Sequence, residues 1–261
     1  ITLRALDVLC SCDALAAEDT RSMRKLLNIH NIPLKDRPIL SYNDFNGDRV
    51  RPTIMNWLNS NMAVAYASDA GMPLIADPGY QLSKQAAEAG FYVTAVPGAS
   101  ACITALSLSG LPTDRFFFEG FLPVSKEKRR QKLKELSSIP STLIFYESPK
   151  RLIKMFEDLI AIMGENRRAV IARELTKKFE QIISGTLGEL HALILKKPLK
   201  GELVVLLDRP LTTGLQDLDV KAELRIALSE MTLKDASDFV ASAHGLSKRY
   251  VYNLALSMRE K

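Results

Sequence analysis

Short apolar runs alternate with longer amphipathic segments in the first half of the chain. The runs at 13–19, 63–69 and 92–98 each end at a charge or a turn, which is typical of buried strands. Segments 48–61 and 80–90 lie between them and have a helical pattern. This alternation predicts an α/β fold in which helices cover a mostly parallel sheet.

The next segment, 99–110, is predicted to be a helix that closes this half of the chain. Ser100 is a suitable N-cap, and Gly110 is a suitable residue to end the helix. Pro112 then breaks the pattern, so we place a domain boundary near 111–115.

The second half has a different pattern. Four apolar runs, at 115–122, 141–148, 167–174 and 201–208, read as strands. Segment 148–164 has the signals of a helix, with Ser148 as its cap and Pro149 at its first position. The run at 180–190 alternates with polar residues, so a strand there has one wet face. Together these runs predict a mixed sheet with helices.

From about residue 211 the apolar strands stop and a small helical appendix is predicted. The proposed division is therefore an α/β domain at 1–112, a second α/β domain at 113–210 and a helical tail at 211–261, with a ligand cleft between the first two.

The totals exclude several classes of protein. A chain of 261 residues with 47% apolar residues can bury a core without disulfides or metals. It contains no apolar run of about 18 residues, so no membrane span is expected. Cys10, Cys12 and Cys102 are an odd count, which argues against a disulfide framework and fits a reducing cytoplasm. The three histidines are scattered, so no metal site is predicted.

The start and the charge of the chain add two weaker expectations. The opening "ITLRALDVLC" has neither a signal peptide nor an initial Met, and we expect a further N-terminal segment to precede it. The formal net charge of +5 is compatible with a polyanionic partner.

Common cofactor and catalytic signatures are absent: there is no GxGxxG after a strand, no GxxxxGK[ST], no HExxH and no GxSxG. A ligand must be bound in another way. The stretch "AYASDAGMPLIADPGY" is a candidate binding loop, because Asp69 ends a strand at the sheet edge where α/β proteins bind ligands. Gly71 permits close backbone approach, and Pro73 and Pro78 stiffen the loop. An ordinary strand–loop–helix connection is the alternative.

Three other polar stretches are candidates, each with a structural alternative. Glu18, Asp19 and Arg21 follow the first strand and can steer a hydroxyl or begin a helix. Backbone N–H groups near Ser100 can meet a carboxylate or can be capped in the usual way. The dense charges of "ARELTKKFE" come directly after a buried strand, which makes them a candidate site. A solvated charge run is the alternative.

Two basic segments are candidates for RNA contact. Segment 125–136 carries six basic residues, which suit phosphates unless it is a solvated helix. In "HGLSKRYVYNLAL", Gly245 makes a turn and Ser247 caps a helix that Lys248 and Arg249 begin. This resembles the second half of a helix-turn-helix, and its basic and aromatic residues suit RNA, or they belong to a small packing domain.

Six stretches together resemble the ribosomal RNA small subunit methyltransferase I family, a branch of the tetrapyrrole methylase superfamily. They are "ITLRAL", "AAEDTR", "SDAGMPLIADPGY", "PGASACITALSLSGLPTDRFFFEGFLP", "TLIFYESPKRL" and "ARELTKKFE", in the family's order and spacing. The resemblance implies a two-domain, class III S-adenosylmethionine-dependent methyltransferase fold. It also implies 2′-O-methylation of a cytidine in 16S ribosomal RNA at the decoding centre (position 1402 in the usual RNA numbering), a cytoplasmic location and a homodimer.

The resemblance also implies roles for residues. S-adenosylmethionine would be held by one loop, by a second loop and by the strands of the second domain, at Ser68, Asp69, Ala70, Gly71, Pro73, Ser100, Ala101, Tyr146, Ala172 and Leu203. The substrate side would comprise Glu18, Asp19, Thr20 and Arg21. The two basic segments add further RNA candidates by their own composition: Lys126, Lys128, Arg129, Arg130, Lys248 and Arg249.

A ribose hydroxyl needs a base, and the candidates are Asp19, Glu18 and Lys177 in that order. Lys177 could act only with a lowered pKa. On this interpretation Asp69 is functional, Asp77 is structural, and Tyr146 presents a ring face near the positive sulfur.

Two features depart from the family pattern: its first strand and Gly-Asn turn precede the part that matches "ITLRAL", and Met72 stands where Thr is common. A tetrapyrrole or other small-molecule methylase on the same fold is an alternative, as is an RNA-binding ribosome-assembly factor without catalysis.

Overall fold

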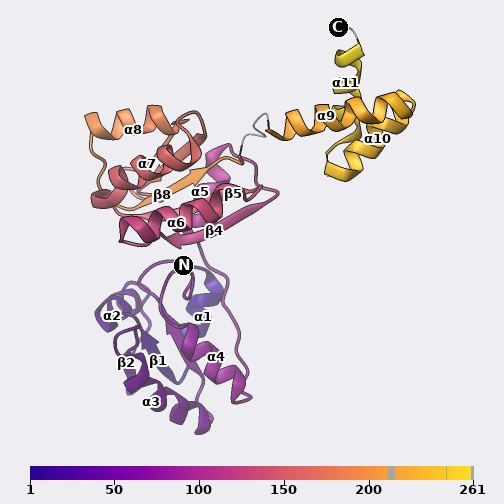
Figure 1. Cartoon of the computed structure of the whole chain (residues 1–261). Coiled ribbons are helices and arrows are strands. Elements are labelled where there is room, and N and C mark those ends of the chain that lie inside the picture. Colours follow the sequence, from indigo (N-terminus) through magenta and orange to yellow (C-terminus); the bar gives the residue numbers. More distant parts are fainter. Residues whose placement is uncertain (211–214, 245, 260–261) are drawn as a thin grey trace. The chain divides into compact units, whose positions relative to one another are not determined.

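The computed structural model describes residues 1–210, 215–244 and 246–259, and Figure 1 shows the order of its elements. Two compact units result, 1–208 and 209–261. The first unit contains two sheets, a three-stranded one and a five-stranded one. The predicted α/β architecture with a helical C-terminal region is confirmed.

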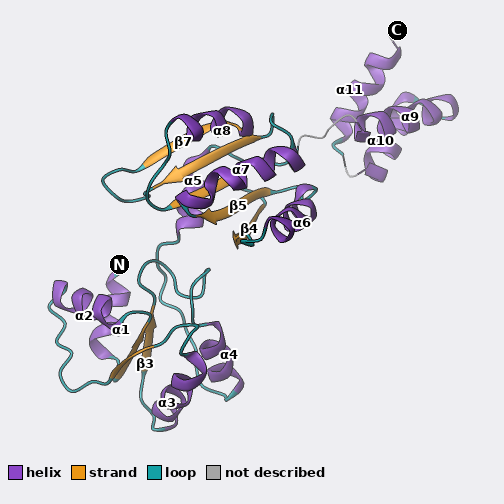
Figure 2. Ribbon diagram, turned by 60° about the vertical axis from the view of Figure 1, so that its left-hand side comes forward, coloured by secondary structure: helices purple, strands orange, loops and turns teal. Residues whose placement is uncertain are grey.

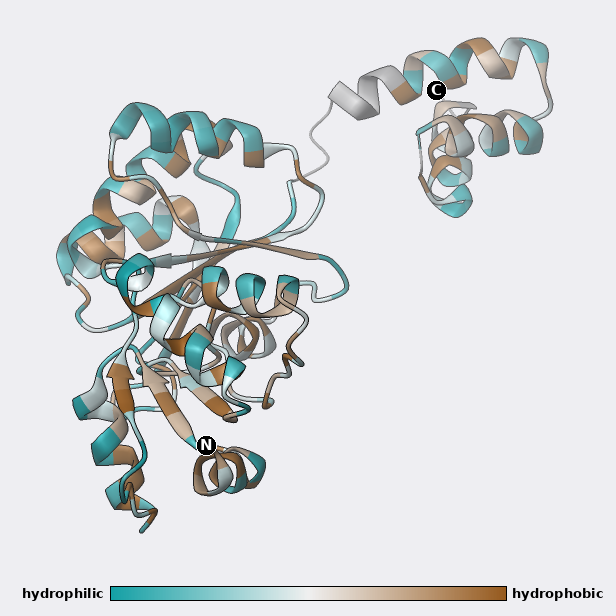
Figure 3. Ribbon diagram, turned by 90° about the horizontal axis from the view of Figure 1, so that it is seen from below, coloured by the Kyte–Doolittle hydropathy of each residue, from teal (hydrophilic) through white to brown (hydrophobic). Residues whose placement is uncertain are grey.

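The three-stranded sheet comes from the first half of the chain. Its strands β1 (Ala14–Ala17), β2 (Ile39–Ser41) and β3 (Val64–Ala67) are all parallel, in the order β2-β1-β3. The helices of this half are α1 (Leu3–Ser11), α2 (Thr20–Ile29), α3 (Gly47–Asn59) and α4 (Tyr80–Glu88). Ala17 pairs with both Ser41 and Ala67, so the three carboxyl ends meet at one edge. Figure 3 shows these strands as largely hydrophobic.

The prediction of a strand at 92–98 was wrong. Within the part of the chain that the structure describes, this segment pairs with no strand, and the Tyr92 side chain is 91% exposed. Pro97 accepts a hydrogen bond from the Thr2 hydroxyl through its carbonyl oxygen (3.2 Å). An apolar run favours extended backbone, but a strand also needs a neighbour for its hydrogen bonds, which a local pattern does not supply.

The five-stranded sheet confirms the strands predicted in the second half, except that the strand predicted at 180–190 ends at 186 and residues 187–190 are helical. It is built from β4 (Phe116–Phe121), β5 (Thr142–Glu147), β6 (Arg168–Arg173), β7 (Gln181–Thr186) and β8 (Leu203–Leu207). Their order is β4-β5-β8-β6-β7, with β4 parallel to β5 and with β8 antiparallel to both β5 and β6. Figure 2 labels the two edge strands, β4 and β7. The carboxyl ends of β4, β5 and β6 therefore lie at the same edge. Every residue of edge strand β7 is exposed or half-buried.

Helices cover both faces of this sheet. One face packs against α6 (Lys126–Ser137), α7 (Pro149–Met163) and α8 (Leu187–Lys196) in a cluster that includes Phe145 and Leu203. The opposite face packs against α5 (Ala101–Ser109), through Cys102, Ala105 and Leu106. Helix α5 precedes the boundary proposed near 111–115 yet packs on the second sheet, and that boundary remains a prediction.

The second unit has its own apolar core. Helices α9 (Leu215–Glu230), α10 (Leu233–His244) and α11 (Lys248–Arg259) enclose a cluster of Val220, Leu224, Ala227, Ala236, Val240, Ala241, Val251 and Ala255. Ser247 caps α11 as predicted, because its hydroxyl accepts from the Tyr250 backbone N–H (3.2 Å). The predicted turn at Gly245 lies outside the described residues. No helix in the described ranges combines the length and the apolar character that crossing a bilayer requires.

Candidate functional site

The loop at 68–79, which follows β3, has an unusual and well-fixed backbone. Gly71, Leu74 and Ala76 have φ angles of 76°, 71° and 59°, in the left-handed region. Such angles at Leu and Ala cost free energy and concentrate at functional sites. The Ser68 hydroxyl donates to the carbonyl oxygens of Ala70 (3.3 Å) and Gly71 (3.2 Å), which closes the turn.

This loop meets the second predicted cofactor loop. The Met72 backbone N–H donates to the Ala99 carbonyl oxygen (2.9 Å). A Cβ added at Gly71 would lie 3.2 Å from the same oxygen, so glycine is what permits the approach. The Met72 thioether lies over Gly98, where an added Cβ would be 3.2 Å from its sulfur. The Met that departs from the family pattern thus packs between the two loops.

Tyr146, at the end of β5 in the five-stranded sheet, contacts the start of α5, directly after the second predicted cofactor loop. Its hydroxyl accepts from the Cys102 backbone N–H (3.0 Å) in the first turn of α5. The rings of Phe118 and Phe121 meet the Tyr146 ring edge-on, at centroid distances of 4.9 and 5.6 Å. Burial raises the pKa of Tyr146, so the hydroxyl stays protonated at neutral pH.

The sequence interpretation missed the contribution of β4. The register of β4 against β5 shifts between Phe118 and Gly120, and Gly120 has a φ of 76°. A Cβ added at Gly120 would lie 3.8 Å from the Cβ of Ala76, which places this bulge beside the 68–79 loop. An isolated Gly within "FFFEGF" was the available signal, because such a Gly indicates a bulge or a close approach.

Ala172 and Leu203 do not share a face of the sheet. The Ala172 side chain is fully buried in the cluster beneath α5, on the side of Tyr146. Leu203 is 3% exposed and packs in the cluster of α6, α7 and α8. Strand alternation therefore directs the Leu203 side chain away from Tyr146, and the prediction that the strands at Ala172 and Leu203 help enclose a ligand stays a prediction.

Glu18 and Asp19 follow β1 and have different partners. The Glu18 carboxylate accepts from the Asp69 backbone N–H (3.2 Å), which ties the first strand end to the 68–79 loop. Asp19 is the N-cap of α2, accepting from the Arg21 backbone N–H (2.8 Å), and it pairs with the Arg21 guanidinium (2.7 Å). These hydrogen bonds lower the pKa of Asp19 to about 2, which makes it a weak base.

Asp77 lies in the same acidic region. Burial and then the Glu18 carboxylate raise the pKa of Asp77, although a hydrogen bond from Ser68 opposes them. Gly79, two residues later, has a φ of 124° and is packed against the Tyr66 ring. An open hollow beside this region joins α2 to the end of β3, and it is lined by Ala17, Asp19, Ser22, Met23, Lys25, Leu26, Ile29, Ser68 and Asp69.

Lys177 does not meet the condition for a base. Its ammonium pairs with the carboxylates of Glu174 (3.1 Å) and Glu202 (3.2 Å). The hydrogen bonds to Glu174 and then Glu202 raise the pKa of Lys177, whereas proton abstraction needs a lowered one. The candidacy of Lys177 as a base is thus contradicted by its partners.

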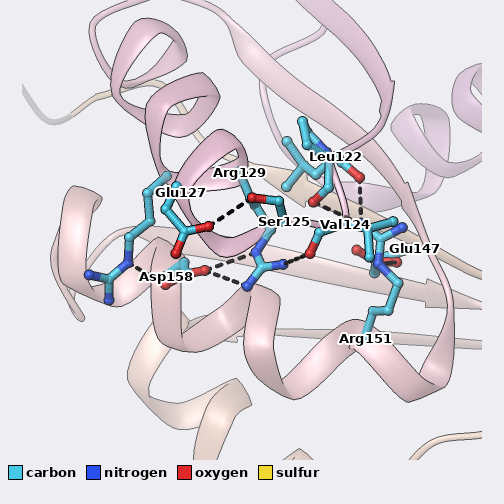
Figure 4. Close-up of polar contacts among 10 residues, drawn as sticks. Leu122, Val124, Ser125, Glu127, Arg129, Glu147, Arg151 and Asp158 are labelled. Atoms are coloured by element: carbon cyan, nitrogen blue, oxygen red, sulfur yellow. Dashed lines mark hydrogen bonds and ion pairs between the residues drawn. The ribbon is translucent and has the colours of Figure 1, made fainter.

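The basic segment 125–136 is the helix α6, but its six cations do not form one surface. Arg129 is 5% exposed and pairs with the buried Asp158 (2.6 Å), so its assignment to RNA was wrong (Figure 4). Arg130 donates to the other oxygen of Asp158 (2.6 Å) while staying partly exposed. Lys126 and Lys128 are exposed. A charge count does not show which cations have a buried partner.

The remaining RNA candidates are accessible. Thr20 begins α2 and is half-buried, while the Arg21 side chain is 90% exposed beside Asp19. In the helical unit, Lys248 pairs with Asp238 (2.9 Å) and Arg249 is exposed at the start of α11. No group of three or more potential metal ligands is found within the described residues.

Comparison with known proteins defines the class first. Residues 1–191 match the family described as Tetrapyrrole (Corrin/Porphyrin) Methylases. The fold resembles that of the solved structures of cobalt precorrin-4 methyltransferase (TM-score 0.58, 15% identity, 80% of this chain and 88% of that one) and diphthine synthase (0.59, 17%, 80% and 84%). Fold and sequence therefore define a methyltransferase of the tetrapyrrole methylase fold.

Closer relatives narrow the assignment. The chain is 44% identical to "Ribosomal RNA small subunit methyltransferase I" of Vibrio cholerae serotype O1, over 98% of this chain and 89% of the relative. The protein of that name from Escherichia coli O157:H7 is 42% identical, over 99% and 91%. Residues 215–259 match the "RsmI C-terminal HTH domain", which confirms the predicted helix-turn-helix resemblance. The chain belongs to the ribosomal RNA small subunit methyltransferase I family.

Proposed function

We propose that this protein transfers a methyl group from S-adenosylmethionine to the ribose 2′-hydroxyl of a cytidine in 16S ribosomal RNA, at position 1402 as the family resemblance implies. The observation that carries the proposal is the junction of three segments: Met72 bonds to Ala99, and Tyr146 bonds to Cys102. The relatives' names support ribosomal RNA as the substrate.

The residues at this junction fit the proposed methyl donor. Gly71 keeps the backbone open where a side chain would meet Ala99, and Asp69 is exposed beside it. Ser100 and Ala101 lead into α5, whose first N–H groups suit a carboxylate. The Tyr146 ring would face a positively charged group. Ser68, Ala70 and Pro73 would complete the loop. When bound, S-adenosylmethionine supplies a methyl group already activated by its positive sulfur.

Among the three candidate bases, Glu18 is the one that we retain. The pKa of Asp19 is lowered to about 2 and that of Lys177 is raised, and both shifts oppose proton abstraction. Glu18 lies half-buried at the end of β1, with its carboxylate beside Asp69. It would hold the ribose hydroxyl and accept its proton.

We expect Glu18→Gln to lower kcat about 100-fold or more, because the amide cannot take up a proton. Its oxygen still accepts from the Asp69 backbone N–H, so the dissociation constant for S-adenosylmethionine should stay unchanged. Asp19→Asn is the matched control, since Asn also caps helices and should leave kcat within a few-fold. Single-turnover methyl transfer and calorimetric titration measure the two quantities. Normal turnover in E18Q would exclude Glu18 as the base.

The remaining partners complete the proposal. The residues that would contact RNA are Thr20, Arg21, Lys126, Lys128, Lys248 and Arg249. Arg129 is excluded because it is buried against Asp158, and Arg130 pairs with Asp158 while staying partly exposed. We further propose a cytoplasmic homodimer that acts on the small ribosomal subunit, as the family resemblance implies.

The test is the transfer of labelled methyl from S-adenosylmethionine to small subunits from cells that lack this activity. Label in a 2′-O-methylated cytidine of 16S RNA is the expected result. Cofactor binding without RNA labelling would instead favour a small-molecule methylase on the same fold, and binding of RNA without any cofactor binding would favour an assembly factor.

A further inference from the structure

The segment that follows β6, which we call the 174–180 loop, is held in a fixed and strained shape. Glu174 and Thr176 have φ angles of 50° and 64°, although neither is glycine. The Glu174 N–H donates to the Glu202 carbonyl oxygen (2.9 Å), and the Glu202 N–H donates to the Glu174 carboxylate (2.8 Å). The Glu180 carboxylate accepts from the Thr176 N–H (2.6 Å). Hydrogen bonds within the protein therefore fix the backbone of this loop without any contribution from a ligand.

The fixed loop presents an aromatic ring to solvent. Phe179 is 63% exposed, and the Lys178 ammonium lies 5.8 Å from the centroid of its ring. A phenylalanine this exposed contributes little to the core, whereas Leu175 in the same loop packs against the α5-side cluster. The loop thus has an anchoring residue, Leu175, and a displayed residue, Phe179.

Its position relates it to the candidate site. Arg173 and Glu147 both pair with Leu203 of β8, so the ends of β6 and β5 are aligned across the sheet. Two strand spacings separate them, about 10 Å. Leu175 and Tyr146 also pack against the same cluster, on the face that α5 covers. The loop therefore begins near Tyr146, at the sheet edge to which we assign methyl transfer.

Cations accompany the ring. Lys178 and Lys200 are exposed, and Arg173 donates from Nε to the Lys200 carbonyl oxygen (2.7 Å), which brings the strand end and the 197–202 connection together. The carboxylates of Glu174 and Glu202 share Lys177 as their partner, and the Glu180 carboxylate accepts from the Thr176 N–H. An exposed aromatic ring with a lysine ammonium beside it complements one class of ligand, an unpaired base attached to phosphates.

We propose that Phe179 stacks on an unpaired RNA base next to the target nucleotide, while Lys178 and Lys200 hold the adjoining phosphates. This inference rests on the proposed function and adds a substrate contact to it. A rigid stacking platform on a loop that begins about 10 Å from the end of β5 would hold a base next to the target nucleotide in an unstacked position.

A fluorescent reporter tests the contact directly. The chain has one tryptophan, Trp57, so Trp57→Phe removes the background and Phe179→Trp places a reporter on the loop of the full-length protein. A single-stranded oligoribonucleotide should quench the introduced indole by stacking, whereas inorganic polyphosphate should not. Leu195→Trp, at an exposed position of α8, is the matched control and should not respond. Equal responses to RNA and polyphosphate, or quenching by S-adenosylmethionine alone, would overturn the proposal.

Kinetics give a second, independent measurement. Phe179→Ala should raise the KM for small ribosomal subunits about 10-fold, in line with the loss of one stacked base. The KM for S-adenosylmethionine should not change, and Phe179→Tyr should restore the wild-type value because a ring is again present. If F179A transfers methyl groups with an unchanged KM for small ribosomal subunits, the stacking contact is overturned although the proposed function stands. Reporter quenching without RNA labelling would instead retain the contact and count against the proposed function.

Discussion

At the scale of single residues, similar side chains have different roles because their neighbours differ. Glu18 and Asp19 are adjacent, yet one carboxylate bonds across to Asp69 and the other caps its own helix and pairs with Arg21. The pKa of Asp19 falls to about 2 as a result. Similarly, Gly79 and Gly90 both have positive φ angles, but only Gly79 faces a packed aromatic ring.

We expect Gly79→Ala to destabilise the protein by about 2–4 kcal/mol, since it adds backbone strain to an overpacked contact. The new Cβ would lie 2.6 Å from Cε1 of Tyr66, at a φ of 124°. Gly90→Ala is the matched control: its φ is 83°, and among the described atoms a Cβ there has none within 4 Å. It should cost only about 1 kcal/mol of backbone strain. Denaturant unfolding measures both, and equal losses would show that the Tyr66 contact is unimportant.

At the scale of elements, one buried and one half-buried arginine attach the connection at 122–125 to the helices that follow it. Arg129 of α6 donates to the Val124 carbonyl oxygen (3.1 Å), and Arg151 of α7 donates to the Leu122 carbonyl oxygen (Figure 4). Asp158 and Glu147 provide the counter-charges. Burial alone would raise the pKa of Asp158, but the hydrogen bonds from Arg130 and Arg129 outweigh it and leave the pKa lowered. The end of β4, beside Tyr146, is held in place by this network.

Replacing Asp158 by Asn should therefore lower the free energy of unfolding by about 3–5 kcal/mol, because it leaves Arg129 buried without a counter-charge. Lys132→Gln is a control from the same helix. Lys132 pairs with Glu119 (3.7 Å) and Glu135 (3.3 Å) near the surface, so its loss should cost at most about 1 kcal/mol. Urea titrations of both variants decide the matter. Similar losses would mean that the Asp158 network contributes no more than a surface pair.

At the scale of the whole molecule, the two units have separate cores. Residues 1–208 contain both sheets, and 209–261 contain the helical cluster around Val220 and Val240. The exposed face of α11 includes Arg249, Tyr252 and Asn253, which are polar or amphipathic side chains suited to RNA. Folding and ligand binding in one unit can therefore be tested without the other.

A protein ending at Asp208 should remain folded and bind S-adenosylmethionine within about two-fold of the full chain, because the residues proposed to hold it lie in the first unit. Its affinity for small subunits should fall, with a weaker salt dependence as phosphate contacts are lost. Circular dichroism, calorimetry and salt-dependent binding measure these effects. A truncated protein that is unfolded, or that binds subunits as tightly as the full chain, would contradict the expectation.

Local patterns were enough to identify most elements, and the six stretches that resemble a known family were enough to indicate the class of protein. Apolar alternation and turn residues predicted β1, β3 and all strands of the second sheet, because these signals depend on neighbours a few positions away. Only the tertiary structure showed that 92–98 has no paired strand, that Arg129 faces Asp158, and that Lys177 is tied to Glu174 and Glu202. Strand pairing, burial and ion pairing join residues far apart in the chain, and they determine which candidate side chains remain available for chemistry.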